Sequence, residues 1–370
     1  MQISCINQLN HTTFAFINNV ERNKNMRNRL IYLLMILTFH CSISAQESKY
    51  NKENYLTIVS YNVENLFDTI DNPSKNDDEY LPSSKHEWNT DKYQKKIKNL
   101  AQVISAINKN ELPELVGLIE IENKDVIQDL ITHKFLLNGN YGIVHEESPD
   151  ERGIDVALIY RKDEFQVIEY HAINIFYDFE PKTKTRDILY VKGKLKNGEI
   201  FYIFLNHWSS RRDGEGTSEP KRLYSAKILR EKMDSLIKKD KKAKIIIMGD
   251  FNDEPSNKSI NEILMANNEQ DNQYDFRLYN LMYDKHLFGY GTYYYKGNWN
   301  MLDNLIVSST LLNSPGKYQV SYDGGQIFSA RWMMYDNVKT GELTPNRTYN
   351  GSNYLGGYSD HFPIYVVLKK

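Results

Sequence analysis

Cysteine is nearly absent from this sequence. The 370 residues contain only Cys5 and Cys41, and both lie before Ala45. The chain from residue 46 onward therefore has no thiol with which to form a disulfide or to bind zinc. The H-E-x-x-H zinc motif is missing as well. Any catalytic metal has to be bound by carboxylates, amides and histidines.

Long apolar runs are also lacking. The candidate at residues 30–39 has ten residues, whereas a helix needs about 20 to cross a bilayer core of about 30 Å. Two arginines precede it in the segment that begins at Met26, and small residues follow it up to Ala45. This pattern is typical of a signal peptide. We predict a leader over residues 1–45, with translation starting at Met26, and a short tail over 46–54.

The leader predicts export to the periplasm or the medium, with no membrane insertion after its removal. A lipid anchor on Cys41 is the alternative. Phe39 and His40 stand where a lipidation site usually has small residues, so this alternative is disfavoured.

Neither sign of charge dominates the chain. It has 46 basic and 48 acidic residues, a net charge of -2. Four basic residues and one acid fall in the leader, which leaves 42 basic and 47 acidic residues, a net charge of -5. Overall charge therefore does not attract nucleic acid. A site for a polyanion has to rely on a local basic cluster or a bound cation.

Strand and helix patterns alternate along the chain. The sequence predicts a helix that starts at Asp91 and helices over 124–136 and 218–239. It predicts strands at 55–63, 115–121, 155–160, 165–173, 243–250, 301–308, 318–323 and 361–369. Asn197-Gly198 predicts the turn of a hairpin within 187–208. The polar stretch 71–90 is predicted to be a surface loop. This order favours an α/β (α+β) fold of two mixed β-sheets packed face to face with helices outside, in one domain over 55–370.

Polar side chains follow many of the predicted strands. Because strand ends gather at one edge of a packed sheet, we expect these groups to converge on a single pocket. They are Asn62, Glu64, Glu120, Glu122, His207, Asp250, Asn252, Asp303, Asp360 and His361.

These residue types suit metal-assisted phosphoryl chemistry. Mg²⁺ prefers carboxylate and amide oxygens, so Glu120 with Asn62 or Glu64 can hold it against a phosphate oxygen. His207 and His361 can act near neutral pH on the attacking water and on the phosphate.

The remaining acids have supporting roles in this hypothesis. Asp303 is the candidate that orients His361, because a carboxylate fixes the tautomer of a histidine and raises its basicity. Asp250 and Asn252 are left to position the water or the leaving group.

Six segments in this order resemble the motifs of the endonuclease/exonuclease/phosphatase superfamily, which includes deoxyribonuclease I. They are SYNVENLFD, GLIEIEN, LNHWSSR, GDFNDEP, LDN and SDHFP. The resemblance covers the chain from residue 55 onward. It implies a deoxyribonuclease-I-like, four-layered αββα sandwich, a divalent metal and in-line attack on a phosphate ester. The metal expected is Mg²⁺, with Mn²⁺ or Ca²⁺ as alternatives.

The resemblance also implies roles by motif position. Glu120 would be the principal metal ligand with Asn62 as its neighbour, and Asp250 and Asn252 would lie beside the scissile phosphate. At Glu64 many relatives carry a different residue, so its metal role is the least supported.

The last two motifs supply the histidine pair of the family. His361 is similar to the histidine that pairs with an aspartate, here Asp303, and Asp360 to an acid that can ligate metal. His207 matches the second histidine of the deoxyribonuclease and sphingomyelinase branches.

Four arginines in loops near these motifs are candidates for substrate binding, because guanidinium forks suit phosphate oxygens. They are Arg152, Arg186, Arg211 and Arg212. Arg211 or Arg212 is favoured because both follow His207 closely, although any single arginine can equally be a solvated surface residue.

Each site residue also has a structural explanation when taken alone. Asn62 and Asp303 can cap turns, and His207 and His361 can be satisfied core histidines. Glu120 is harder to explain, because an acid that ends an apolar strand needs a partner or a metal. The six motifs together favour catalysis.

The sequence thus predicts an exported, monomeric, Mg²⁺-dependent phosphodiesterase, with a nuclease acting on DNA or RNA as the specific hypothesis. The alternative is a phosphatase or sphingomyelinase-like hydrolase of a small or lipid-linked phosphate ester. A binding module without turnover is a third possibility. The aromatic segment 289–300 can stack bases, although packing at a sheet edge is the favoured interpretation.

Overall fold

The computed structural model describes residues 54–212, 214–270, 277–312, 314–338 and 341–370. The predicted leader, residues 1–45, and all but the last residue of the predicted tail lie outside these ranges. One compact unit runs from Glu53 to Lys370. Within the described ranges, no helix combines the length and apolarity that a membrane span needs.

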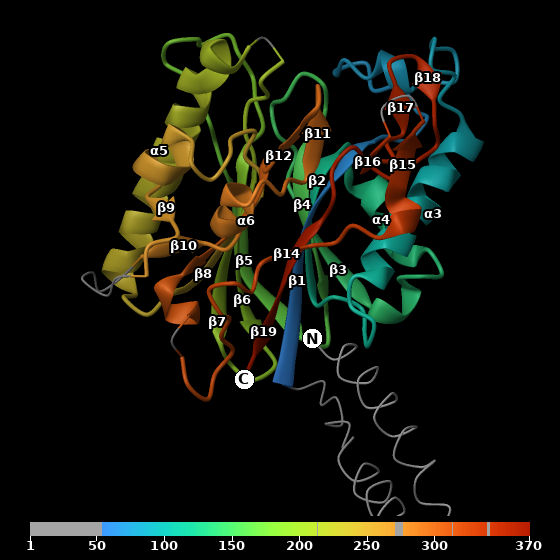
Figure 1. Cartoon of the computed structure of the whole chain (residues 1–370). Coiled ribbons are helices and arrows are strands. Elements are labelled where there is room, and N and C mark those ends of the chain that lie inside the picture. Colours follow the sequence, from blue (N-terminus) through green and yellow to red (C-terminus); the bar gives the residue numbers. More distant parts are fainter. Residues whose placement is uncertain (1–53, 213, 271–276, 313, 339–340) are drawn as a thin grey trace, which may run out of the picture. The chain divides into compact units, whose positions relative to one another are not determined.

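Two β-sheets form the centre of this unit (Figure 1). The first has the strand order β14 (Gln326–Ile327), β19 (Ile364–Lys369), β1 (Tyr55–Leu66), β2 (Leu115–Ile121), β4 (Asp155–Arg161) and β3 (Tyr141–His145). The second has the order β5 (Phe165–Ile173), β6 (Ile188–Leu195), β7 (Ile200–His207), β8 (Lys244–Asp250), β13 (Asp303–Ser308), β10 (Leu278–Asn280) and β9 (Ala266–Asn267).

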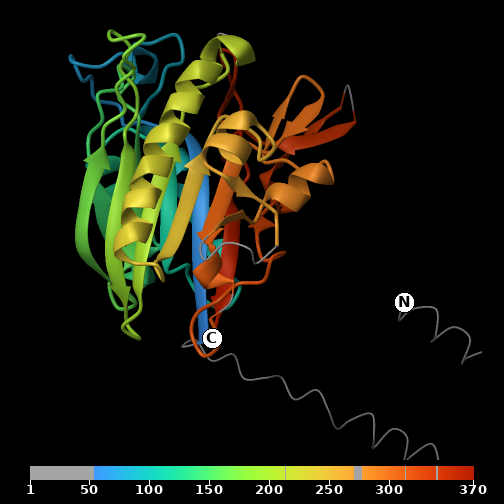
Figure 2. The ribbon, with the colours of Figure 1, turned by 90° about the vertical axis from the view of Figure 1, so that its left-hand side faces the viewer.

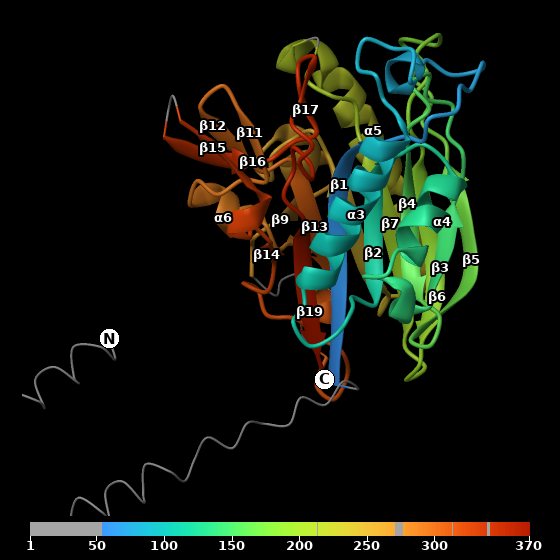
Figure 3. The ribbon, with the colours of Figure 1, turned by 90° about the vertical axis from the view of Figure 1, so that its right-hand side faces the viewer.

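Helices cover the outer face of each sheet. Helices α3 (Thr90–Ala106) and α4 (Lys124–Thr132) lie over the first sheet, as Figure 3 shows. Helix α5 (Glu215–Lys239) lies over the second, with the short π-helix η4 (Ser259–Ile263) against it (Figure 2). The four-layered αββα sandwich is therefore confirmed.

Shorter elements complete the unit. They are the helices η2 (Asp78–Tyr80), η3 (Leu137–Gly139), α6 (Tyr283–Leu287), η5 (Ser309–Leu311) and η6 (Arg331–Met333), and the strands β11 (Tyr293–Tyr295), β12 (Asn298–Asn300), β15 (Met334–Asn337), β16 (Glu342–Pro345), β17 (Tyr349–Asn350) and β18 (Asn353–Tyr354).

The alternation of side chains along each strand builds three apolar layers. In β1, Ile58 packs into the core between the sheets, whereas Val59 packs toward α3 and α4. In β8, Ile246 belongs to the central core, and Ile247 belongs to the layer beneath α5. Both faces of these strands are buried, which is why their sequences are continuously apolar.

The strand pairing brings the polar strand ends to one edge. β1 and β2 run parallel, and so do β7 and β8. In the second pair His207 lies directly opposite Asp250, and Asp303 at the start of antiparallel β13 is also paired with Asp250. Carboxyl ends of parallel strands meet at the same edge, so the fold itself gathers these three side chains.

Gly249 permits this close approach of β7 and β8. Its φ is +140°, and a Cβ atom at this position would lie 1.9 Å from the backbone oxygen of Asn206. No L side chain fits there, so the glycine before Asp250 is required by the backbone of the neighbouring strand.

Several predicted boundaries differ from the structure. No strand forms over 318–323 apart from a single bridge from Gln319 to Lys369. The final strand begins at Ile364, after Pro363, which cannot donate a ladder hydrogen bond. Helix α5 begins earlier than predicted and contains Pro220 near its start, and the predicted hairpin turn at Gly198 is present.

Candidate active site

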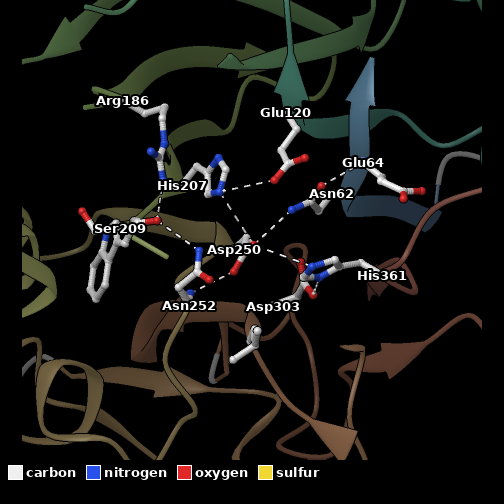
Figure 4. Close-up of polar contacts among 12 residues, drawn as sticks. Asn62, Glu64, Glu120, Arg186, His207, Ser209, Asp250, Asn252, Asp303 and His361 are labelled. Carbon is white, nitrogen blue, oxygen red and sulfur yellow. Dashed lines mark hydrogen bonds and ion pairs between the residues drawn. The ribbon is translucent and has the colours of Figure 1, made fainter. Parts of the chain in front are cut away.

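The predicted polar groups other than Glu122 meet in or beside a cleft of about 570 Å³ at the shared edge of the two sheets. Figure 4 shows Asn62, Glu120, His207, Asn252, Asp303 and His361 arranged around Asp250. They come from β1, β2, β7, β13 and the segments that follow β8 and precede β19. Residues far apart in the sequence therefore share one site.

Asp303 and His361 form a buried, hydrogen-bonded pair. His361 Nδ1 lies 2.7 Å from Asp303 Oδ2, which also accepts a hydrogen bond of 2.5 Å from Thr292 Oγ1. Burial alone would lower the pKa of His361, but the charge and hydrogen bond of Asp303 outweigh it and raise the pKa well above its usual value. His361 Nε2 is left facing Asp250, at 3.9 Å from Oδ2.

Asp250 is the centre of the cluster. Its Oδ2 accepts a hydrogen bond of 3.0 Å from Asn62 Nδ2, and its Oδ1 one of 2.8 Å from the backbone N–H of Asn252. Burial and the nearby charge of Asp303 raise its pKa to about 7, although His361 opposes them. A carboxyl group with such a pKa can exchange a proton near neutral pH.

His207 remains neutral in this environment. Burial and the charges of Arg186 and Arg152 lower its pKa well below the usual value. Its Nε2 lies 3.7 Å from Glu120 Oε1 and 3.8 Å from Asp250 Oδ2. A neutral imidazole here can donate one hydrogen bond to an oxygen placed in the cleft.

Glu120 lies at an irregularity of its strand. The register of β2 against β4 shifts between Ile119 and Ile121, and Glu120 has a φ of +68°. Such bulges redirect a side chain and recur beside active sites, where their strain is tolerated for function. The bulge turns Glu120 into the cleft instead of toward the helices on the outer face.

The oxygens around Glu120 fit a hard divalent cation. Glu120 Oε2 accepts a hydrogen bond of 2.9 Å from the backbone N–H of Asn65, and Oε1 faces His207 across the cleft. Asn62 lies beside it, and Asp360, on the same cleft, is held by Arg347 at 2.6 Å. Carboxylates and an amide without sulfur are the donor set of Mg²⁺, Mn²⁺ or Ca²⁺.

Two residues lie differently from what the sequence suggested. Glu64 points away from Glu120 and Asp250 (Figure 4), and its Oε2 accepts a hydrogen bond of 2.6 Å from the backbone N–H of Thr348. Arg211 borders the cleft, but its guanidinium is bonded to Asn252 O at 2.6 Å, Asp253 Oδ1 at 3.0 Å and Asn257 Oδ1 at 2.7 Å. It holds the loop after β8, which leaves little of it for substrate.

The other predicted arginines line the cleft on the His207 side. Arg186 is fixed by Asp150 at 3.0 Å and by the backbone oxygen of Trp208 at 2.7 Å, and Arg152 is hydrogen-bonded to Asn65. Arg212 is exposed and has no ion-pair partner within the described part of the chain. These side chains remain candidates for substrate binding.

Sequence reasoning missed Arg347, and it named Tyr293 and Thr292 only as part of the aromatic segment 289–300. Arg347 and Tyr293 line the cleft, and Thr292 supports Asp303 from the loop before β11. None of them stands beside a predicted strand end, so no local pattern marks them. Only the folding of the segments 289–300 and 346–361 onto the sheet edge brings them to the site.

A second cluster of potential ligands lies outside the cleft. His145, Glu147 and Asp155 have ligand atoms within 4.8 Å of one another. Both carboxylate oxygens of Asp155 already have hydrogen-bonding partners. Oδ2 lies 3.1 Å from His145 Nε2, and Oδ1 accepts a hydrogen bond of 2.9 Å from the backbone N–H of Ser148. Glu147 is exposed, and none of the three residues lines the cleft that holds Glu120.

A family model described as the endonuclease/exonuclease/phosphatase family matches residues 57–370. The chain belongs to this family. A search of the curated proteins finds no match. Membership in the endonuclease/exonuclease/phosphatase family places the chain among enzymes that hydrolyse phosphate esters.

Solved structures of the endonuclease/exonuclease/phosphatase family share the fold at low sequence identity. A family protein from Bacteroides thetaiotaomicron is 18% identical, with a TM-score of 0.52 over 85% of this chain and 97% of that one. TDP2 from D. rerio, complexed with single strand DNA product, is 15% identical, with a TM-score of 0.52 over 85% and 99%. A family protein from Bacteroides vulgatus is 16% identical, with a TM-score of 0.50 over 85% and 98%.

Proposed function

We propose that the protein is an exported, Mg²⁺-dependent phosphodiesterase that hydrolyses DNA or RNA. The observation that carries the hydrolytic part is the buried pair of Asp303 and His361 facing Asp250, opposite Glu120 and His207 in one cleft. This arrangement supplies a base for water and donors for a phosphate within a few ångströms of each other.

His361 is the base in the proposed mechanism. Asp303 holds its Nδ1 side, so Nε2 faces the cleft and takes a proton from the attacking water. Asp250 aligns this water or gives its proton to the leaving oxygen, which its pKa of about 7 allows. His207 and the side-chain amide of Asn252 donate hydrogen bonds to the phosphate oxygens as charge grows on them.

The proposed cation would be held by Glu120, with Asn62 and Asp360 as neighbouring oxygen donors. A cation held by these residues would supply positive charge to stabilise the phosphate as negative charge grows on it. The protein residues around it orient the ester and keep His361 and the water in line.

Arginines on both sides of the catalytic centre support a polynucleotide substrate. In Figure 4, Arg186 and Glu64 lie on opposite sides of Asp250, and Glu64 is the contact of Arg347. A chain with a phosphate on each side of the scissile bond can use both groups. These arginines provide the local positive charge that a polyanion site needs in a chain without an overall basic charge.

A panel of substrates tests this proposal. We expect the purified mature protein to cleave plasmid DNA or RNA and bis-p-nitrophenyl phosphate with Mg²⁺, and to lose this activity in EDTA because Glu120 has no cation to share with the phosphate. Restored Mg²⁺ should restore cleavage. Release of phosphocholine from sphingomyelin, or of phosphate from sugar phosphates, without cleavage of nucleic acid would favour the alternative ester hydrolase. Full cleavage in EDTA would refute the metal requirement.

Export has its own test. We expect the protein recovered outside the cytoplasm to have the mass of a chain that begins at Gln46, because cleavage is predicted after Ala45. Mass spectrometry of periplasmic and medium fractions measures this. Recovery of the uncleaved chain in the cytoplasm alone would contradict it.

A further inference from the structure

Arg347 lines the cleft with His361, and two carboxylates contact its guanidinium. Its Nη2 lies 2.6 Å from Asp360 Oδ2, and its Nε lies 3.6 Å from Glu64 Oε1. It is also hydrogen-bonded to Tyr293, whose ring lies 4.8 Å from that of His361. The side chain is about one third exposed, and it lines the cleft together with Asp250 and His361. The three contacts fix the guanidinium while part of it stays open to the cleft.

Glu64 is held in turn by a buried lysine. Lys96 of α3 is 1% exposed, and its Nζ lies 3.7 Å from Glu64 Oε2. The same Nζ donates hydrogen bonds of 2.6 Å to Thr348 Oγ1 and 2.8 Å to the backbone oxygen of Tyr358. Burying a lysine is costly unless its charge is paired, so the ion pair with Glu64 compensates for this position.

The segment that carries Arg347 depends on this ion pair. Thr348 receives contacts from both partners, because its backbone N–H donates to Glu64 and its hydroxyl accepts from Lys96. Asn99, one turn further along α3, donates hydrogen bonds to the backbone oxygens of Gly356 at 3.2 Å and Gly357 at 2.6 Å. Helix α3 thereby anchors the loop that leads from Arg347 to His361.

We propose that Arg347 binds the scissile phosphate from the His361 side, and that Glu64 and Lys96 are positioning residues for Arg347 rather than ligands of the metal. This inference rests on the proposed phosphodiesterase function and adds the residue that recognises its phosphate. Glu120 and the cation would neutralise one non-bridging oxygen, and the guanidinium would donate to another. A planar fork held by an acid on each side is suited to such an oxygen.

Arg347 differs from the arginines across the cleft in the side of the site that it faces. Arg211 spends its donors on the loop after β8, and Arg186 spends two on Asp150 and Trp208. Both lie across the cleft from Arg347, which faces the side where the nucleophile is activated. The predicted metal role of Glu64 is replaced by a role in arginine placement.

A double-mutant cycle between Glu64 and Arg347 tests the proposal. The variants are Glu64→Gln, Arg347→Ala and the double substitution, and the probes are inorganic phosphate by calorimetry at fixed Mg²⁺ and Mn²⁺ by electron paramagnetic resonance. We expect Arg347→Ala to weaken phosphate binding by about tenfold or more, because charged hydrogen bonds are lost. Glu64→Gln should weaken it by a few fold, and the double variant should match Arg347→Ala alone.

Metal binding and kinetics separate the two roles of Glu64. We expect the Mn²⁺ affinity to be unchanged in Glu64→Gln, and the KM for bis-p-nitrophenyl phosphate to rise with the phosphate Kd in all three variants. Arg347→Lys should recover only part of the loss, because an ammonium cannot reproduce the planar fork. Arg331→Ala, which removes an exposed arginine paired with Asp336, is the matched control and should change neither affinity.

Glu64→Gln leaves Lys96 buried without its charged partner, so a second variant protects the test from misfolding. Glu64→Gln with Lys96→Met removes both charges, and it should weaken phosphate binding at least as much as Glu64→Gln, because the hydrogen bonds of Lys96 to Thr348 and Tyr358 are lost as well, with unchanged Mn²⁺ affinity. A fall in Mn²⁺ affinity on Glu64→Gln, or losses that add in the double variant, would overturn the positioning role. Unchanged phosphate affinity in Arg347→Ala would overturn the binding role. A wild-type protein that binds phosphate but hydrolyses no ester would refute the proposed function alone.

Discussion

His361→Ala is expected to lower kcat for bis-p-nitrophenyl phosphate about a thousandfold while leaving the fold intact. A positioned general base contributes on the order of 10² to 10⁴ in rate, and His361 is the imidazole whose Nε2 faces Asp250 in the cleft. The Mn²⁺ affinity should stay close to that of the wild type, because Glu120 is untouched. Steady-state kinetics at saturating Mg²⁺ and circular dichroism measure the two expectations.

The pH dependence gives this prediction a second readout. A base works only when it is neutral, so the wild-type rate should rise with pH as His361 loses its proton. Asp303 raises the pKa of His361, with help from Asp250 and Asp360, so the rise should lie above the usual histidine range. Asp303→Asn removes the negative charge that contributes most to raising the pKa of His361. Burial, which lowers this pKa, remains. The rise in rate should therefore move to lower pH. All profiles are taken at one Mg²⁺ concentration, because a bound cation also lowers this pKa.

A surface histidine provides the control. His171→Ala removes an exposed imidazole on the edge strand β5 and should alter neither kcat nor the profile. If His361→Ala kept the wild-type rate, or if Asp303→Asn left the rise in place, another group would be the base. The neutral His207 would then be the first to test.

The convergence of the strand ends could be predicted because it follows from local patterns. Apolar runs that stop at polar residues mark the carboxyl ends of buried strands, and parallel pairing places such ends together. The sequence alone therefore predicts that Asn62, His207 and Asp250 lie close together, as the structure has them. Glu122 shows the limit of the same rule: it follows the same strand as Glu120, yet its Oε2 accepts a hydrogen bond of 2.7 Å from Asp68 in the loop after β1, away from the catalytic groups.

What could not be predicted depends on contacts between distant segments. The bulge at Glu120 changes which face of the sheet this side chain points to, against the alternation expected for a regular strand. Nothing in "LVGLIEIEN" predicts the bulge. Arg347 reaches the cleft only because Lys96 and Asn99 of α3 hold its loop. Arg211 or Arg212 is favoured by closeness to His207 in sequence, but the guanidinium of Arg211 donates its hydrogen bonds to Asn252, Asp253 and Asn257 in the loop after β8.

Glu120→Gln is expected to have the second large effect. The amide keeps the size of the side chain and can still accept from the backbone N–H of Asn65, but it removes the negative charge that a divalent cation needs. We expect the Mn²⁺ affinity to fall at least about tenfold, and kcat/KM at a fixed, low Mg²⁺ concentration to fall by about 10³, as the charge opposite the phosphate is lost. Raising the metal concentration should recover part of the rate, because the substitution lowers the occupancy of the cation site and leaves the base, His361, unchanged.

Glu122→Gln is the matched control, two residues further along the chain and directly after β2. Its acceptor role toward the backbone N–H of Asp68 survives the substitution, and its side chain lies outside the catalytic cleft. The bulge at Glu120 is what separates these two acids, so the pair tests the backbone geometry as well as the ligand. Metal binding should fall in Glu120→Gln alone. An equal loss in both variants would mean that the cation is held by the wider acidic surface and not by the residue that the bulge turns inward.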